Sequence, residues 1–172
     1  MPRTVIIVIG PMCSGKSTFC QAAAKAGYLI ANDDAIVTAV HGGIYGLYSK
    51  SLKPLYKGIE LEIIRTGLAL GRDVIVDRAT NMNLHCRRKY IGLATSLDAQ
   101  VLGILTPNHG PEEHARRRFS KNNRGLSYEH WLQAAQRHSL EFVKPTFAEG
   151  FTEIITLAEA YQRFIPVPEG VL

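Results

Sequence analysis

Hydrophobic runs that suit buried strands alternate with segments of helical periodicity along the chain. Residues 5–9 are five consecutive β-branched aliphatic side chains, which is typical of a strand buried on both faces of a parallel sheet. Further strands are predicted over 28–31, 73–77, 99–105 and 151–157. Helical spacing of apolar residues, or helix start and stop signals, predict helices over about 18–25, 35–40, 51–70, 84–95, 111–124 and 127–141. This alternation predicts an α/β fold of three layers, with about five parallel strands flanked by helices.

A glycine-rich segment follows the first predicted strand directly. It reads Gly10-Pro11-Met12-Cys13-Ser14-Gly15-Lys16-Ser17-Thr18 and fits the P-loop pattern GxxxxGK[ST]. In this pattern the glycines let backbone N–H groups surround phosphate oxygens at the N-terminus of a helix. Lys16 is expected to reach the β- and γ-phosphates of ATP, and the hydroxyl of Ser17 to bind Mg²⁺. These nine residues therefore predict a nucleoside triphosphate site.

Carboxylates stand at the ends of two other predicted strands. Asp33 and Asp34 follow the second strand, and Asp77 ends the third. Ligands of open α/β sheets bind outside the carboxyl ends of the strands, so all three are expected near the γ-phosphate. We expect Asp33 to accept a proton from an attacking hydroxyl and Asp34 to cap the next helix, although helix capping alone is the alternative for both. An acid at the place of Asp77 is typical of a Mg²⁺ site.

Basic residues gather in two places, although the net charge is only +5. Arg116, Arg117, Arg118, Lys121 and Arg124 lie within nine residues, and Arg87, Arg88 and Lys89 form a second group. The first group is expected to belong to a lid, over about residues 111–128, that closes on ATP. The second predicts either contacts with acceptor phosphates or nucleic acid, or simply a solvated face.

The length and the cysteines bound the class of protein. The 172 residues suit one domain, residues 1–172, and three cysteines give neither a disulfide framework nor metal-ligand spacing. A reducing cytoplasm is therefore the expected location. The N-terminal apolar run is too short for a signal peptide or a membrane span, so we expect no membrane partner.

Over residues 4–157 the motifs resemble the 5′-hydroxyl kinase domain of the polynucleotide kinases, a group of P-loop kinases that includes phage-type enzymes. The resemblance rests on the P-loop, on residues 26–28, on Asn32-Asp33-Asp34, on Arg118-Phe119 with Arg124-Gly125, and on residues 141–151. Asp77 with Thr80 and Asn81 is similar to the family's Asp-x-Thr-Asn turn, with one extra residue in this chain.

The resemblance implies a kinase that uses ATP and Mg²⁺ and phosphorylates a hydroxyl of a nucleic acid. It implies that Asp33 is the general base and that Arg118 and Arg124 grip the nucleotide phosphates. The acceptor would be bound by Asp33, Thr80 and Asn81. Phage-type enzymes carry an arginine three residues after the base, where this chain has Ile36, so recognition of the acceptor must differ or be supplied by Lys50, Lys53, Arg87 or Arg88. We expect Arg87 and Arg88 to bind the acceptor.

Four readings of the function follow. The 5′-hydroxyl end of DNA or RNA is the leading acceptor. The second is the hydroxymethyl group of a modified pyrimidine in DNA, such as 5-hydroxymethyluridine, and the third is a nucleoside, nucleotide or other small alcohol. A non-catalytic NTP-dependent switch is the alternative from another class.

Overall fold

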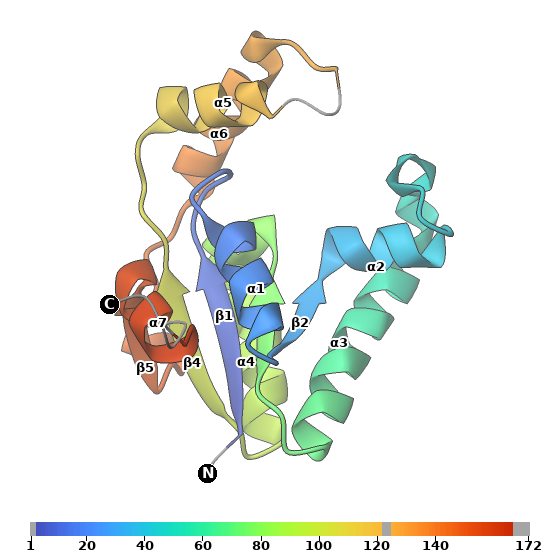
Figure 1. Cartoon of the computed structure of the whole chain (residues 1–172), viewed down its shortest axis with the longest axis vertical. Coiled ribbons are helices and arrows are strands. Elements are labelled where there is room, and N and C mark those ends of the chain that lie inside the picture. The colour runs from blue at the N-terminus through green and yellow to red at the C-terminus, as the bar shows by residue number, and fades with distance from the viewer. Residues whose placement is uncertain (1–2, 122–124, 167–172) are drawn as a thin grey trace.

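A computed structural model of the protein describes residues 3–121 and 125–166. Five parallel strands form one sheet in the order β2-β3-β1-β4-β5 (Figure 1). Their bounds are β1 Thr4–Ile9, β2 Leu29–Asn32, β3 Val74–Asp77, β4 Gln100–Leu105 and β5 Glu153–Thr156. The expected α/β fold with about five parallel strands is confirmed, and each strand agrees with its predicted range to within about two residues.

Helices cover both faces of the sheet (Figure 1). The side chains of β1 alternate between these faces. Ile6 and Val8 pack against α1 (Lys16–Lys25) and α7 (Leu157–Phe164), whereas Val5, Ile7 and Ile9 pack against α3 (Lys53–Ala69) and α4 (Leu84–Ser96). Because β1 is central and buried on both sides, its sequence is apolar at every position from 5 to 9.

The strand register brings the expected site residues to one edge. Val8 of β1 and Asn32 of β2 both pair with Asp77 of β3, so the three strands end at the same level. The P-loop follows β1 at this edge, and α2 (Asp33–Val40) follows β2. The carboxyl edge of the sheet therefore gathers Lys16, Asp33 and Asp77, which lie far apart in the sequence.

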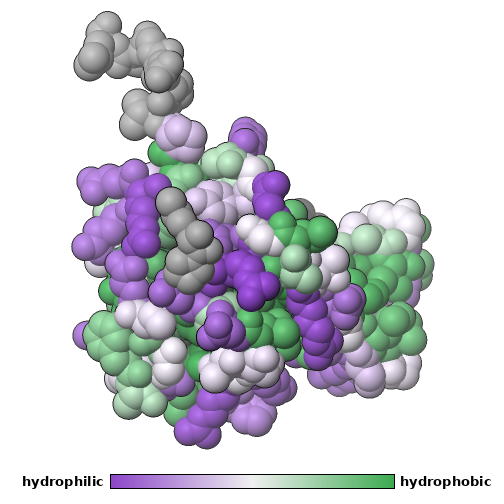
Figure 2. Space-filling view, turned by 90° about the horizontal axis from the view of Figure 1, so that it is seen from below, coloured by the Kyte–Doolittle hydropathy of each residue, from purple (hydrophilic) through white to green (hydrophobic). Residues whose placement is uncertain are grey.

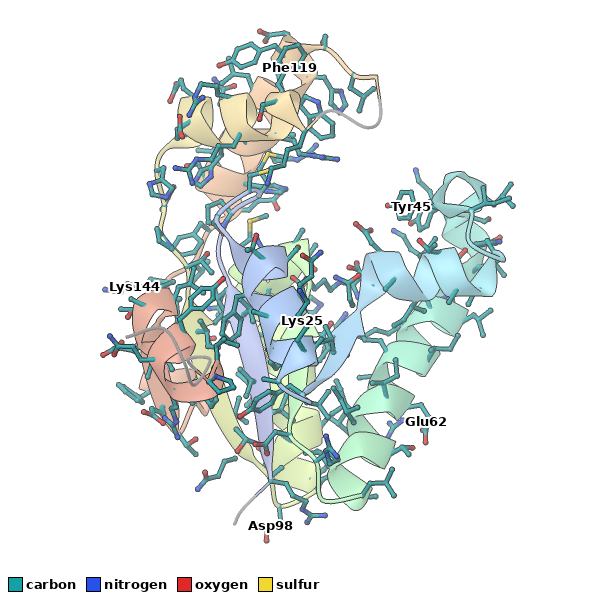
Figure 3. The ribbon with its side chains drawn as sticks, viewed as in Figure 1. Lys25, Tyr45, Glu62, Asp98, Phe119 and Lys144 are labelled. Carbon is teal, nitrogen blue, oxygen red and sulfur yellow. The ribbon has the colours of Figure 1, made fainter. Side chains whose placement is uncertain are left out.

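Two segments project beyond this edge on its two sides (Figures 1 and 3). One is the pair α5 (Pro111–Ser120) and α6 (Tyr128–Glu141), on which Figure 3 labels Phe119. The other joins α2 to α3 through the short helices η1 (Tyr45–Leu47) and η2 (Lys50–Leu52), with Tyr45 labelled at its tip. The remaining short helices are η3 (Ala79–Met82) and η4 (Phe147–Glu149).

Two details correct the expectations from sequence. Helix α5 ends at Ser120 rather than near residue 124, and Arg124 lies outside the described residues. Helix α3 begins at Lys53, because residues 50–52 form η2 instead. Between α5 and α6, Trp131 packs with Ala115 and Ala135, and Met12 of the P-loop packs against this cluster.

The surface is mostly hydrophilic on the side of the amino-terminal strand ends (Figure 2). A protrusion at the right of Figure 2 is richer in hydrophobic residues and corresponds to the segment between α2 and α3 with the first turn of α3. Ile44 and Leu47 of this segment and Leu55 of α3 are exposed. Among the described residues, no helix combines the length and the apolar character that crossing a bilayer requires.

Candidate active site

The P-loop is held open by close packing against the end of β4. A Cβ added to Gly10 would lie 1.8 Å from Oγ1 of Thr106, so no larger residue fits at this position without movement. The Thr106 hydroxyl also hydrogen-bonds to the hydroxyl of Ser14, at 2.6 Å, and donates to the carbonyl of Ile9. Gly15, with φ 103°, starts α1 at its N-terminus. A glycine turn that leads directly into the N-terminus of a helix is the arrangement in which backbone N–H groups can bind a phosphate.

Lys16 is buried beneath the loop. Its Nζ donates to the carbonyls of Gly10 and Pro11, at 2.8 and 2.5 Å. Burial lowers the pKa of Lys16, and the nearby carboxylate of Asp77 opposes that shift. Both bonds are to neutral carbonyls, and a lysine ammonium binds charged phosphate oxygens more strongly than neutral acceptors.

The donor set beside Lys16 suits Mg²⁺. The Asp77 carboxylate is buried, accepts from Asn32 Nδ2 at 3.0 Å, and is hydrogen-bonded to the hydroxyl of Ser17. Burial raises the pKa of Asp77, while Lys16 acts in the opposite direction. A carboxylate and a hydroxyl in contact offer the oxygen ligands that Mg²⁺ prefers. The residues present therefore fit the ion.

Asp33 occupies the first turn of α2, next to the end of β3. One of its carboxylate oxygens lies 3.3 Å from Nε of Arg78, and 33% of its side chain is exposed. Burial raises the pKa of Asp33 to about 6, although the Arg78 guanidinium acts in the opposite direction. A carboxylate with this pKa is ionised at neutral pH and is a stronger base than an ordinary aspartate.

Asp34 does not cap this helix, contrary to the expectation. The cap is Asn32, whose side-chain oxygen accepts from the backbone N–H of Ala35 at 2.7 Å. The Asn32 amide group also donates to Asp77, so one side chain caps α2 and orients the carboxylate beside the P-loop. Because asparagine can donate and accept at once, it serves both contacts, which an aspartate could not.

A buried carboxylate that the sequence reading missed supports Arg78. Glu60 of α3 is fully buried, and its carboxylate accepts from Lys57 at 2.5 Å, from Arg78 at 3.1 Å and from Tyr90 at 2.8 Å. Arg78 thereby links Glu60 to Asp33. Helical spacing in the sequence could have indicated this burial. Glu60 lies four residues before Ile64, on the face of α3 that points into the core.

Two of the four residues that were expected at the acceptor, in addition to Asp33, are buried in the fold. Arg87 has no exposed surface, and its guanidinium binds both carboxylate oxygens of Glu149 at 2.7 Å. Asn81 is also fully buried, where its amide nitrogen joins the ends of β1 and β3 through the carbonyls of Val8 and Val76. The acceptor-binding expectation is therefore corrected for both, because neither side chain can reach a ligand.

Of the other expected residues, Thr80 and Arg88 are exposed and Arg118 is partly buried. The Thr80 hydroxyl accepts from Nε of Arg78 at 2.9 Å. Arg118 lies on α5 with its guanidinium 4.5 Å from the ring centre of Trp131 and donates to the carbonyl of Lys121. Arg118 is thus on the segment that projects over the carboxyl edge, as the lid expectation requires, whereas nothing structural is described for Arg124.

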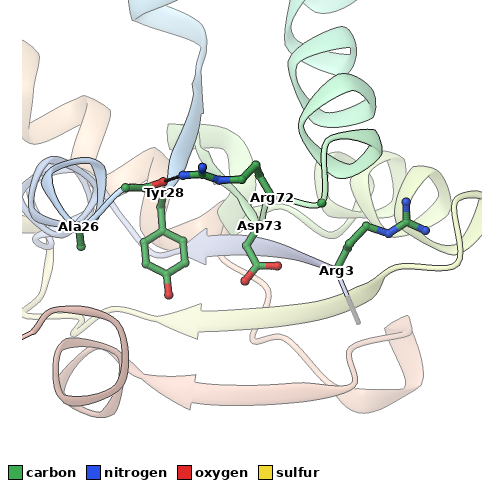
Figure 4. A pocket seen from close by; sticks show the side chains of 7 residues that line it. Arg3, Ala26, Tyr28, Arg72 and Asp73 are labelled. Atoms are coloured by element: carbon green, nitrogen blue, oxygen red, sulfur yellow. Dashed lines mark hydrogen bonds between the residues drawn. The ribbon is translucent and has the colours of Figure 1, made fainter. Parts of the chain in front are cut away.

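A cavity lies at the amino-terminal ends of the strands, and none of the expected site residues lines it. This cavity of about 400 Å³ is lined by residues that include Arg3, Tyr28, Arg72 and Asp73 (Figure 4). Its arginines are committed to the fold, since Arg72 donates to the carbonyl of Gly27 and Arg3 to that of Leu68. Ligands of open α/β sheets bind outside the carboxyl ends of the strands. The P-loop edge is therefore the candidate active site.

Residues 5–145 match the AAA_33 family, described as an AAA domain. This match covers most of the chain, so the chain belongs to that family, and its fold is that of a P-loop kinase. No curated protein sequence matches the chain.

Solved structures with this fold include several kinases. A protein from Chloroflexus aurantiacus j-10-fl, provisionally described as a kinase, has a TM-score of 0.67 at 17% identity over 91% of this chain and 85% of its own. A chain of the Pnkp1/Rnl/Hen1 RNA repair complex has a TM-score of 0.64 at 17% identity; 83% of this chain aligns with 47% of that one. Shikimate kinase from Bacteroides thetaiotaomicron has a TM-score of 0.55 at 14% identity, covering 93% and 95%. At such identities the likeness concerns the fold alone.

Proposed function

We propose that this protein is an ATP-dependent kinase that transfers the γ-phosphate to a hydroxyl of a nucleic acid, and that the 5′-hydroxyl end of DNA or RNA is the acceptor. One observation carries the proposal. A half-buried carboxylate with a pKa of about 6, Asp33, stands at the carboxyl edge of the sheet beside a complete P-loop. A site that only sensed ATP, without transferring or hydrolysing a phosphoryl group, would not need a base at this position.

The reaction follows from these positions. The P-loop and Lys16 hold the phosphates of ATP, and Ser17 and Asp77 hold Mg²⁺, which neutralises charge on the phosphate oxygens when bound. The acceptor hydroxyl donates its hydrogen bond to Asp33, and its oxygen attacks the γ-phosphorus in line. The bond from the γ-phosphorus to the bridging oxygen breaks, ADP leaves, and the proton moves to Asp33. Arg118 and Arg124, on the proposed lid of residues 111–128, would offset charge on the transferring group.

A nucleic-acid acceptor is supported by two observations. Cationic side chains, Arg88 and Lys89, are exposed at the start of α4 close to the carboxyl edge, where a phosphate backbone would lie. The fold is shared with a chain of an RNA repair complex as well as with small-molecule kinases. Ile36 keeps the hydroxymethyl-pyrimidine acceptor in consideration, because it is buried with Val37 and Tyr56 and offers no charge to an end phosphate.

A labelling experiment tests the proposal. The protein is incubated with γ-labelled ATP and oligonucleotides with free or blocked 5′ ends, DNA with hydroxymethylated bases, and free nucleosides. We expect label on free 5′ ends, no label with Asp33→Asn, and retained transfer with the neighbouring control Asp34→Asn. Asp33→Asn should still bind ATP. Label on 5′-blocked, hydroxymethylated DNA would replace the leading acceptor, label on nucleosides alone would exclude nucleic acid, and release of phosphate without any labelled acceptor would identify an NTP switch.

A further inference from the structure

A small cationic pocket lies between the first turns of α3 and α4, beside the candidate base. It has a volume of about 50 Å³ and is lined by Lys57 of α3, by Arg78, and by Cys86, Lys89 and Tyr90 of α4. Arg78 directly follows β3, so this side of the pocket lies at the carboxyl edge, where the P-loop and Asp33 also lie.

The charges around this pocket do not balance. Three cations, Lys57, Arg78 and Lys89, line it, and the buried Glu60 pairs with the first two. Arg78 also contacts Asp33. Two carboxylates therefore face three cations, and Lys89 is exposed with no ion pair to another described residue. Burial lowers the pKa of Lys57, and Glu60 opposes that shift. Arg78 and Lys89 lower this pKa further by repulsion, which an anion in the pocket would relieve.

The cations are also fixed in place. Glu60 is fully buried and accepts hydrogen bonds from Lys57 and Arg78, and the Tyr90 hydroxyl donates to Glu60 and accepts from Lys57 at 2.8 Å. Lys57 and Arg78 therefore lose little conformational freedom when a ligand binds. A rigid arrangement of donors around an excess of positive charge is the usual form of a phosphate site.

We propose that this pocket binds a phosphate group carried by the acceptor, as a monoester or a diester. The proposal deepens and rests on the proposed kinase function. Arg78 joins the two sites, because its Nε lies 3.3 Å from Asp33 and its side chain lines the pocket. A hydroxyl bound at Asp33 and a phosphate bound in the pocket would thus lie on two sides of the same guanidinium group. A nucleotide unit carries a hydroxyl and a phosphate on one sugar, so it could place one group at each position. Lys57, Arg78 and Lys89 supply the charge that Ile36 and the buried Arg87 do not.

Cys86 lines the pocket and gives a reporter that is independent of kinase activity. The protein is treated with iodoacetamide in sulfate and in chloride at equal ionic strength, and alkylation of each cysteine is followed by mass spectrometry. We expect sulfate to slow alkylation of Cys86 severalfold, and Lys89→Gln to remove this protection. The control Arg65→Gln removes an exposed charge from α3 outside the pocket and should leave it intact. Equal rates of Cys86 alkylation in the two salts, or protection that persists in Lys89→Gln, would overturn the proposal.

Acceptor kinetics provide the second test and identify the source of the phosphate. Wild type and Lys89→Gln are compared on a nucleoside, its 3′-phosphate, a dinucleotide with a free 5′-hydroxyl, and glycerol 3-phosphate. The variant should raise KM about tenfold for the phosphate-bearing acceptors that are used, which corresponds to one charge-assisted contact, and leave KM for ATP and the nucleoside unchanged. Activity on glycerol 3-phosphate alone would point to a free phosphorylated alcohol. If KM is unchanged in the variant for every acceptor, the phosphate-binding role of the pocket is wrong, but the kinase function is not contradicted. If wild type transfers phosphate to none of these acceptors, the kinase function is wrong, and the alkylation experiment alone tests the pocket.

Discussion

Replacing Arg87 by methionine tests whether this arginine stabilises the fold or binds the acceptor. The guanidinium is fully buried and makes five hydrogen bonds, two to Glu149 and one each to the carbonyls of Asn81, Met82 and Val143. These contacts tie α4 to the chain segment from 143 to 149. Arg87→Met would leave the Glu149 carboxylate, 8% exposed, without its partner.

Removing one partner of a buried ion pair costs about 3–5 kcal/mol. In a protein of this length each kcal/mol changes Tm by roughly 2–4 °C, so Arg87→Met should lower Tm by about 6–20 °C. The double variant Arg87→Met with Glu149→Met should recover much of the loss, because no uncompensated charge remains buried. Arg88→Met, at the neighbouring exposed position, should change stability by less than about 0.5 kcal/mol.

Differential scanning calorimetry of the four proteins, with ATP and acceptor KM values measured well below each Tm, completes the test. The expected pattern is a large loss of stability in Arg87→Met with an acceptor KM close to that of wild type. A Tm equal to that of wild type, combined with a raised acceptor KM, would show that Arg87 contacts the acceptor and that the buried ion pair does not carry the stability.

The pH dependence of kcat/KM should rise with an inflection near pH 6, since Asp33 must be ionised to accept a proton and its pKa is raised to about 6; a profile flat from pH 5 to 8 would remove Asp33 as the base. Glu60→Gln should move that inflection to lower pH, because a negative charge near Asp33 is lost and Arg78 is released toward Asp33. The same variant should reduce kcat more than it changes KM for ATP. A pH profile identical to that of wild type would show that Glu60 only supports packing. Thr106→Val should weaken ATP binding about fivefold in calorimetric titration, as the loss of roughly 1 kcal/mol from the hydrogen bond to Ser14 implies; unchanged affinity would mean that the P-loop holds its shape without it.

Much of the site can be predicted from local sequence because its parts are contiguous. The P-loop needs a strand, a glycine turn and a helix N-terminus in immediate succession, and residues 4–25 contain all three. The positions of Asp33 and Asp77 followed from a general rule, that parallel strands bring their carboxyl ends to one edge.

The errors have a different origin. Arg87, Arg88 and Lys89 are consecutive in the sequence, and nothing in their spacing tells which one faces inward. The fold buries Arg87 against Glu149, 62 residues away, and leaves its two neighbours exposed. Asp34 and Asn32 are both common cap residues, and the cap is decided by where β2 ends, which depends on its pairing with β3.

The sequence by itself thus determined the strands, the nucleotide-binding loop and the edge at which chemistry can occur, since these depend on hydrophobic periodicity and on residues adjacent in the chain. Only the tertiary structure decided which charged side chains are available to a ligand. Burial and pairing depend on contacts between residues that are distant in sequence, as in the group of Asp33, Arg78, Glu60 and Lys57, where three segments of the chain meet.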